Sequence, residues 1–223
     1  MSIAIVTVVD TGVDDALALV VAVRHPALDL RGVVCTGGNV PLPRVLTNTR
    51  YVLGLLDAEV PIAVGAERRL DGRPFGDRSV HGPDGLAGLG PPDDPPDGTS
   101  APTAADLITP DAVVVSLAPL TPLVGVPAGR IVASYARPGQ GNYEMDPAAA
   151  AAVVVEHSDV SDHPVRITPG GTPVGELVTG LLRHQARRGK STGDAAVLLN
   201  LAEPELDPRQ WARSVQSLAV GGD

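Results

Sequence analysis

The N-terminal run of β-branched residues constrains the fold of this chain more than any other segment. Residues 2–9 (SIAIVTVV) are almost all apolar and do not alternate with polar residues. A strand with one face in water alternates polar and apolar side chains, so this run predicts a strand buried on both faces, as in a parallel sheet. Residues 14–24 (DDALALVVAVR) then predict a helix, because acidic residues stand in its first turn and His25-Pro26 follows its end.

The same succession of strand, turn and helix repeats along the chain. We expect further strands at residues 30–36, 62–64, 112–117, 130–134 and 165–168. We expect further helices at residues 43–56, 147–156, 174–188 and 193–201. Alternating units of this kind predict an α/β fold with a doubly wound, mostly parallel sheet, helices on both faces and a Rossmann-like core.

Length and composition predict one domain over residues 1–223, since no shift in composition divides the chain. Residues 88–103 (GLGPPDDPPDGTSAPT) have almost nothing apolar to bury, and their prolines do not sustain a helix or a central strand. This segment predicts a mobile loop within the domain. Its role is either an active-site lid or a plain surface loop.

Charge and composition exclude several classes of partner. The formal net charge is −9, and the sequence shows neither a Lys/Arg stripe nor an aromatic platform, which disfavours nucleic acid polymers. No apolar run reaches the length of a membrane span, and the N-terminus lacks the basic segment and apolar core of a signal peptide. The lone Cys35 excludes an internal disulfide. We therefore expect a cytoplasmic protein that acts on a small molecule and has no membrane partner.

Three aspartates, Asp10, Asp14 and Asp15, cluster where the first strand gives way to the first helix. In parallel α/β sheets the ligand crevice lies beyond the carboxyl ends of the strands, which is where these residues fall. Carboxylates this close repel one another, and a hard cation such as Ca²⁺ or Mg²⁺ would offset the repulsion. The alternative is that the acidic residues only cap the helix, which is common in a first turn.

Seven short motifs follow one another along most of the chain. They are VVDTGVDDA (8–16), GGN (37–39), VPIAVGAERRL (60–70), HGPDGLAG (81–88), VVVSLAPLTPLVGV (113–126), GNYEMDPAAAAAVV (141–154) and GDAAVLL (193–199). In this order they resemble DxDPGxDDA, the GN turn, PVYAGA, HGxxGL, LGPLTNIA, FNxxxDPEAA and HDPLA of the inosine-uridine-preferring nucleoside hydrolase family. The resemblance implies a nucleoside hydrolase-like fold and calcium-dependent hydrolysis of the N-glycosidic bond of a ribonucleoside or nucleoside-like metabolite, with release of ribose and base.

The same resemblance implies a calcium site and a homo-oligomer. A Ca²⁺ ion would be held by the carboxylates of Asp10, Asp15 and Asp194 and by the backbone carbonyl of Thr121. The ion would bind a water and the ribose hydroxyls, which lowers the pKa of the water so that it becomes a nucleophile near neutral pH. Members of the family usually form dimers or tetramers, so a homo-oligomer is expected.

The remaining matched residues would bind the sugar and the nucleophile. Asp10 would accept the proton of the water, and Asn39 would help to orient it. Asp14 and Asn142 would hydrogen-bond the ribose, and Gln140 stands where the family usually has a glutamate that contacts the sugar. Because cleavage develops positive charge on the sugar, a pocket lined with carboxylates would stabilise the transition state.

The leaving base also needs a proton or a hydrogen bond. Some members of the family use a histidine directly before the last metal-binding aspartate, but this chain has Gly193 there. His81 in the HG loop is the remaining candidate acid, because imidazole is a suitable general acid near pH 7. The alternative is a loop histidine with a local hydrogen bond.

The chain departs from the family pattern in places that favour a second interpretation. Val8 occupies the position of the first aspartate, Thr11 replaces the usual proline, and the chain stops at Asp223, short of the family's length. A smaller lid or a partner protomer would then exclude water. The second interpretation is a catalytically impaired or repurposed homologue that binds a ribosyl ligand. A third, phosphoryl transfer on Asp10, lacks a P-loop or a lysine-bearing phosphate site.

Overall fold

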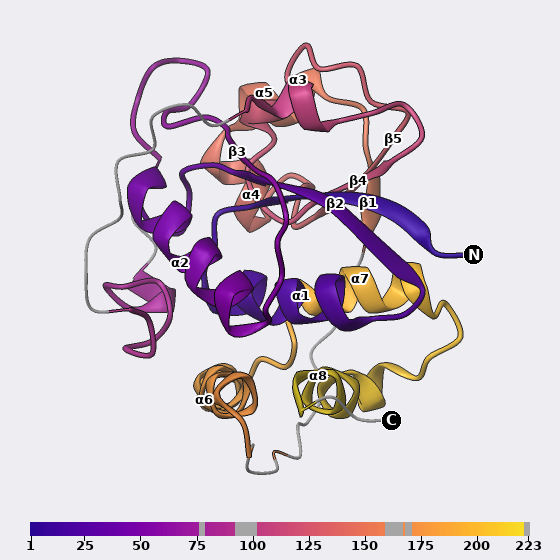
Figure 1. The fold of residues 1–223 in the computed structure, drawn as a ribbon. Helices are drawn as coiled ribbons and strands as arrows, with labels where there is room; N and C mark the ends of the chain where they lie inside the picture. Colours follow the sequence, from indigo (N-terminus) through magenta and orange to yellow (C-terminus); the bar gives the residue numbers. More distant parts are fainter. Residues whose placement is uncertain (76–78, 92–101, 159–166, 168–170, 221–223) are drawn as a thin grey trace.

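The computed structural model describes residues 1–75, 79–91, 102–158, 167 and 171–220 (Figure 1). The strands are β1 (Ile3–Val9), β2 (Leu28–Cys35), β3 (Ile62–Val64), β4 (Val113–Ser116), β5 (Arg130–Ser134) and β6 (Glu156–Ser158). The α-helices are α1 (Val13–Arg24), α2 (Leu42–Leu55), α3 (Ala104–Leu107), α4 (Gly141–Met145), α5 (Pro147–Ala152), α6 (Pro173–Arg187), α7 (Ala195–Ala202) and α8 (Trp211–Val220). Short 3₁₀ helices are η1 (Ser79–His81), η2 (Thr121–Leu123) and η3 (Pro208–Gln210).

The strands form one parallel sheet in the order β3-β2-β1-β4-β5-β6. The chain thus winds outward in both directions from β1 and β4, which confirms the predicted doubly wound α/β fold. Val8 of β1 pairs with Val34 of β2 on one side and with Ser116 of β4 on the other. The carboxyl ends of these strands therefore lie level with one another, and the crevice between β1 and β4 opens beyond them.

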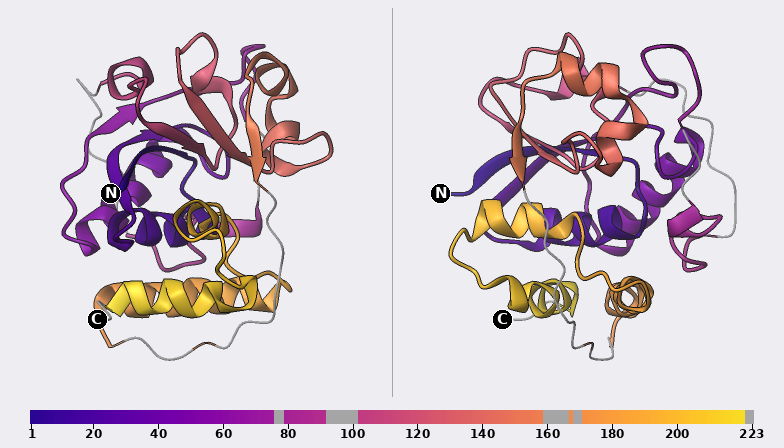
Figure 2. Two further views of the ribbon diagram at one scale, coloured as in Figure 1. Left: turned by 90° about the vertical axis from the view of Figure 1, so that its right-hand side faces the viewer. Right: turned by 180° about the vertical axis from the view of Figure 1, so that it is seen from behind.

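Helices cover both faces of the sheet (Figures 1 and 2). Helices α1, α2 and α7 pack on one face, and α6 and α8 form an outer layer against them (Figure 2). The other face carries a smaller apolar cluster to which α3, α5 and η2 contribute. Helix α1 lies between the sheet and the outer layer, which explains why Ala16 to Val21 are all fully buried. This burial fixes the start of α1, where two of the aspartates lie.

Several predicted elements need correction. The helix predicted over residues 147–156 was wrong in its second half, because α5 ends at Ala152 and β6 begins at Glu156. The alanines of α5 give way to three valines at residues 153–155, and β-branched side chains favour an extended backbone. Of the strand predicted at 165–168, all but Ile167 lie outside the described residues, and Ile167 is not in a strand.

The C-terminal helix α8 was not predicted, although Trp211, Val215 and Ala219 repeat at helical spacing and are buried. Of the loop predicted at 88–103, residues 92–101 lie outside the described part of the chain. None of the helices in the described residues combines the length and the apolar character that a bilayer crossing requires.

Candidate active site

The polar residues singled out from the sequence gather beyond the carboxyl ends of the strands. Asp10 directly follows β1, and Asp14 and Asp15 occupy the first turn of α1. Asn39 follows β2, Asn142 lies in α4 just after β5, and Asp194 is the N-cap residue of α7. The parallel sheet thus brings together residues that lie far apart in the sequence.

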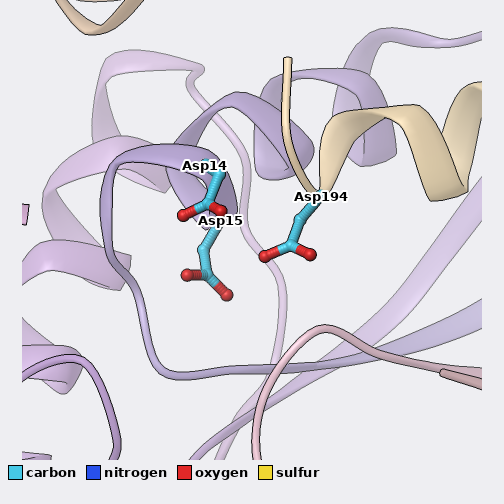
Figure 3. A group of neighbouring side chains, drawn as sticks. All are labelled: Asp14, Asp15 and Asp194. Carbon is cyan, nitrogen blue, oxygen red and sulfur yellow. The ribbon is translucent and has the colours of Figure 1, made fainter. Parts of the chain in front are cut away.

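Three carboxylates form a compact group. One oxygen each from Asp14, Asp15 and Asp194 lies within 4.8 Å of the others, and the side chains point into a common space between α1 and α7 (Figure 3). The Asp15 carboxylate accepts a hydrogen bond from the Gly12 backbone N–H at 2.9 Å. The Ser134 hydroxyl, at the end of β5, donates to Asp194. Both partners fix the direction of the carboxylates.

Asp10 is held by Asn39, which also reaches Asp15. The Asn39 backbone N–H donates to Asp10 Oδ2 at 2.8 Å, and its side-chain Nδ2 donates to Asp10 Oδ1 at 2.9 Å and to Asp15 Oδ2 at 3.1 Å. A Cβ atom at Gly38 would stand only 1.9 Å from Asp10 Oδ2, so the turn approaches Asp10 as closely as only glycine allows. Asn39 therefore links the Asp10 and Asp15 carboxylates.

Burial makes negative charge costly at three aspartates of the site, Asp10, Asp15 and Asp194. Burial raises the pKa of Asp10 to about 7, although the hydrogen bond from the Asn39 backbone lowers it. Burial and the charge of Asp10 raise the pKa of Asp15 well above its ordinary value. Burial and the charge of Asp14 do the same for Asp194, against the opposing effect of Ser134. The protein alone offers too little positive charge here to hold all of these carboxylates ionised.

This donor set fits an oxygen-preferring divalent cation. The carboxylates of Asp14, Asp15 and Asp194 converge, and Asp14 Oδ1 is buried without a hydrogen-bond partner. Hard cations such as Ca²⁺ and Mg²⁺ take carboxylate and carbonyl oxygens as ligands. The group contains Asp14, to which the resemblance assigns the ribose, and does not include Asp10, which the resemblance makes a ligand. The Thr121 carbonyl accepts a hydrogen bond from Val124 at 3.3 Å, and its role as a ligand stays a prediction.

A cavity of about 420 Å³ opens above the carboxylates. Its lining includes six of the residues singled out from the sequence: Asp14, Asn39, His81, Gln140, Asn142 and Asp194. The His81 Nδ1 atom accepts a hydrogen bond from the Val13 backbone N–H at 3.1 Å and lies 3.6 Å from Asp14 Oδ1. A neutral His81 therefore carries its proton on Nε2.

The 80–81 segment is supported by α6. The His184 Nε2 atom donates to the Val80 backbone carbonyl at 2.8 Å, across 104 residues of sequence. This bond ties the element that carries His81 to the outer layer of helices.

The two sugar-binding candidates after β5 are already engaged by the backbone. The Asn142 Nδ2 atom donates to the Leu117 carbonyl at 2.8 Å and to the Ser134 carbonyl at 3.0 Å. Its Oδ1 atom is therefore the part that could accept from a ribose hydroxyl. The Gln140 Oε1 atom accepts from the Arg137 N–H at 2.9 Å, which leaves its Nε2 atom as the donor toward a ligand.

The departures at Gly193 and Val8 have local physical reasons. Gly193 has a φ of +54°, and a Cβ atom there would lie 2.5 Å from the Asp14 Cβ atom, so a histidine side chain does not fit this arrangement. Val8 is fully buried in the apolar cluster that also contains Leu120 and Leu123. An aspartate at position 8 would place a carboxylate among apolar side chains, which is costly.

Several cavity residues were missed at the sequence level. Tyr135, Gln185, Arg188 and Lys190 also line the cavity. No motif marks them, and the C-terminal residues of α6 looked like an ordinary basic helix end. Ser134 lay within a predicted strand, and only its place at the strand's carboxyl end hinted at a role.

Comparison with known proteins identifies the family. The family model described as "Inosine-uridine preferring nucleoside hydrolase" matches residues 5–125, which include every site residue up to Thr121. The chain belongs to this family. A protein from a region 3′ of ribF in Corynebacterium ammoniagenes is 44% identical over 80 residues, which are 34% of this chain and 85% of that protein.

More distant relatives have named activities. The non-specific ribonucleoside hydrolase RihC of Escherichia fergusonii is 39% identical over 79 residues, 35% of this chain and 26% of that enzyme. The match thus spans about a quarter of RihC. The solved structure of a plant nucleoside hydrolase, PpNRh1, superposes with a TM-score of 0.73 at 19% identity, covering 92% of this chain and 80% of that one. At this identity the likeness shows that the fold is shared.

Proposed function

We propose that this chain hydrolyses the N-glycosidic bond of a ribonucleoside or a nucleoside-like metabolite with the help of Ca²⁺. The observation that carries the proposal is the convergence of the Asp14, Asp15 and Asp194 carboxylates. Two of them, Asp14 and Asp194, line a cavity together with Asn39, His81 and Asn142. Membership of the nucleoside hydrolase family supports it.

The proposed calcium ligands are Asp10, Asp15, Asp194 and the Thr121 carbonyl, with Asp14 close enough to join them or to hold a ribose hydroxyl. When bound, such an ion lowers the pKa of a water molecule and orients the ribose hydroxyls. The protein's own part is to hold the carboxylates in place, through Asn39 at Asp10 and Asp15 and through Ser134 at Asp194.

Proton movement is assigned to two residues. Asp10 accepts the proton of the attacking water, since Asn39 holds its carboxylate beside the proposed ion and a carboxylate can act as a general base. His81 presents its Nε2 proton to the leaving base, because Nδ1 is occupied by the Val13 N–H. The carboxylates of Asp14 and Asp194, which line the cavity, stabilise the positive charge that develops on the sugar.

A second candidate function is binding of a ribosyl ligand without turnover. Gly193 favours it, because the position that supplies an acid in some relatives has no space for a side chain. Tight binding of a nucleoside in calorimetry, together with no hydrolysis across a broad panel, would support this function over the first.

The test is to incubate the chain with Ca²⁺ and a panel of common ribonucleosides and to follow the release of free ribose. We expect release from at least one nucleoside, its loss on chelation, and a decrease of at least about 100-fold in Asp10→Asn, as for other groups that act in proton transfer. Asp29→Asn is the matched control, because Asp29 stands near the start of β2, at the opposite end of the sheet, paired with Arg31. No ribose from any nucleoside, or equal rates in Asp10→Asn and Asp29→Asn, would overturn the proposal.

A further inference from the structure

The end of helix α6 forms a basic wall of the candidate active-site cavity. Both Arg188 and Lys190 line the cavity beside Gln185, which is buried. The Arg188 and Lys190 backbone N–H groups both donate to the Gln185 carbonyl, at 2.9 and 3.0 Å, and Gly189 between them has a φ of +69°. This left-handed residue turns the chain back on the helix end, so Lys190 returns to the side of Gln185.

Charge is segregated within the cavity. The carboxylates in the lining are those of Asp14 and Asp194, which belong to the converging group. The segment after β5 contributes the neutral amides of Gln140 and Asn142. The cations of the lining are Arg188 and Lys190, apart from a protonated His81. A ligand in this cavity therefore meets negative charge at Asp14 and Asp194 and positive charge at Arg188 and Lys190.

Basic residues at a helix C-terminus are favoured by the helix dipole alone, but that explanation does not account for where these two lie. Arg183 and Arg187 belong to the same basic end and are exposed, yet neither lines the cavity. Lys190 lies beyond the last helical residue and reaches the cavity only because the chain turns at Gly189.

We infer that the ligand of this site carries an anionic substituent, and that Arg188 and Lys190 bind it. The inference rests on the proposed function, whose substrate class it narrows from nucleosides in general to negatively charged ones. Guanidinium and ammonium groups recognise phosphate and carboxylate through charge-assisted hydrogen bonds. The substituent is a phosphate ester on the ribose or a carboxylate on the base, and both have the same chemistry toward the wall.

The test compares uridine with uridine 5′-monophosphate and with orotidine, each in the presence of Ca²⁺. We expect kcat/KM for one of the two anionic compounds to exceed that for uridine by at least about tenfold, and the better one identifies the position of the charge. Arg188→Gln and Lys190→Gln should each reduce that preference by at least about tenfold, the lower end of the contribution of a hydrogen bond to a charged group. Arg187→Gln, on the same helix end, should leave the preference unchanged.

Calorimetry with the same three compounds separates this inference from the proposed function. Tighter binding of an anionic compound than of uridine, abolished in the Arg188→Gln/Lys190→Gln double variant, supports the basic wall even if no compound is hydrolysed. Hydrolysis of uridine with equal kcat/KM for all three compounds leaves the hydrolase standing and overturns the inference. A preference for an anionic compound that the double variant retains overturns it as well.

Discussion

Replacing Gly38 with alanine tests how tightly the turn after β2 holds Asp10. The new Cβ atom would stand 1.9 Å from Asp10 Oδ2, and this distance must widen by about 1 Å to reach the 3.0 Å below which real Cβ contacts essentially never fall. Gly38 is not among the residues with positive φ, so alanine can adopt its backbone conformation. The effect of the substitution is therefore steric and is directed at the carboxylate.

The loss of stability in Gly38→Ala can be estimated from the hydrogen bond that must break or lengthen. Asp10 Oδ2 accepts the Asn39 backbone N–H at 2.8 Å, and a shift of about 1 Å breaks this bond or pushes the turn away. A hydrogen bond to a charged group contributes about 1.5–3 kcal/mol, and overpacking a buried site costs about 1–3 kcal/mol. We expect Gly38→Ala to lower the free energy of unfolding by about 2–3 kcal/mol, which corresponds to a decrease in Tm of about 4–12 °C for a chain of this size.

Thermal unfolding followed by circular dichroism, with and without Ca²⁺, measures this effect. Gly54→Ala is the matched control: Gly54 lies in α2 with nothing within 4 Å of its Cβ position, so alanine should leave Tm equal or raise it. Gly38→Ala should also weaken the stabilisation by Ca²⁺. A Tm of Gly38→Ala within about 1 °C of the wild type, with unchanged Ca²⁺ stabilisation, would refute the close approach of the turn to Asp10.

Three further predictions concern the carboxylates and the leaving-group acid. Because burial raises the folded-state pKa of Asp10 to about 7, and those of Asp15 and Asp194 in the same direction, these groups stabilise the metal-free protein fully only below their unfolded pKa near 3.8. Urea denaturation of chelated protein should show stability falling between about pH 4 and pH 7, and a rise over this range would contradict the burial argument. Gly193→His should lower Tm and should not raise kcat, since φ is +54° and no space exists for a side chain; a gain in ribose release would show that the site opens to admit it. His81→Gln should lower kcat about 100-fold and leave Ca²⁺ stabilisation of Tm unchanged, and an unchanged kcat would remove His81 from the reaction.

The fold could be predicted well wherever local pattern and burial agree. The β-branched run before Asp10 predicts β1 because a strand with both faces covered needs no polar residues. The sequence predicts the valines at 153–155 as the end of a helix, because the alanines before them are strong helix formers and the switch to β6 depends on pairing with β5. Helix α8 packs against α1 and α6 with Trp211 buried in the shared apolar cluster, and no local signal specifies these long-range contacts.

The site was predictable to the extent that residues follow a strand. Asp10 and Asn39 stand at the ends of adjacent parallel strands, so sheet geometry alone brings them together. Asp194 comes from a distant helix start, and only the family resemblance pointed to it. Lys190 reaches the cavity through a single left-handed residue, Gly189, and a sequence does not show on which side of a helix end such a turn places the next side chain.

The hydrogen bond from His184 to the Val80 carbonyl gives the outer helix layer influence over the chemistry. Helix α6 also carries Gln185 and leads into the basic wall of Arg188 and Lys190. The same helix therefore supports both the segment that carries His81 and this wall. Under the proposed function, a substitution on the α6 surface that rotates this helix slightly would change the distance from the His81 proton to a bound base without touching any carboxylate. Preference for the leaving group would then evolve separately from binding of the sugar, with α6 as the adjustable part.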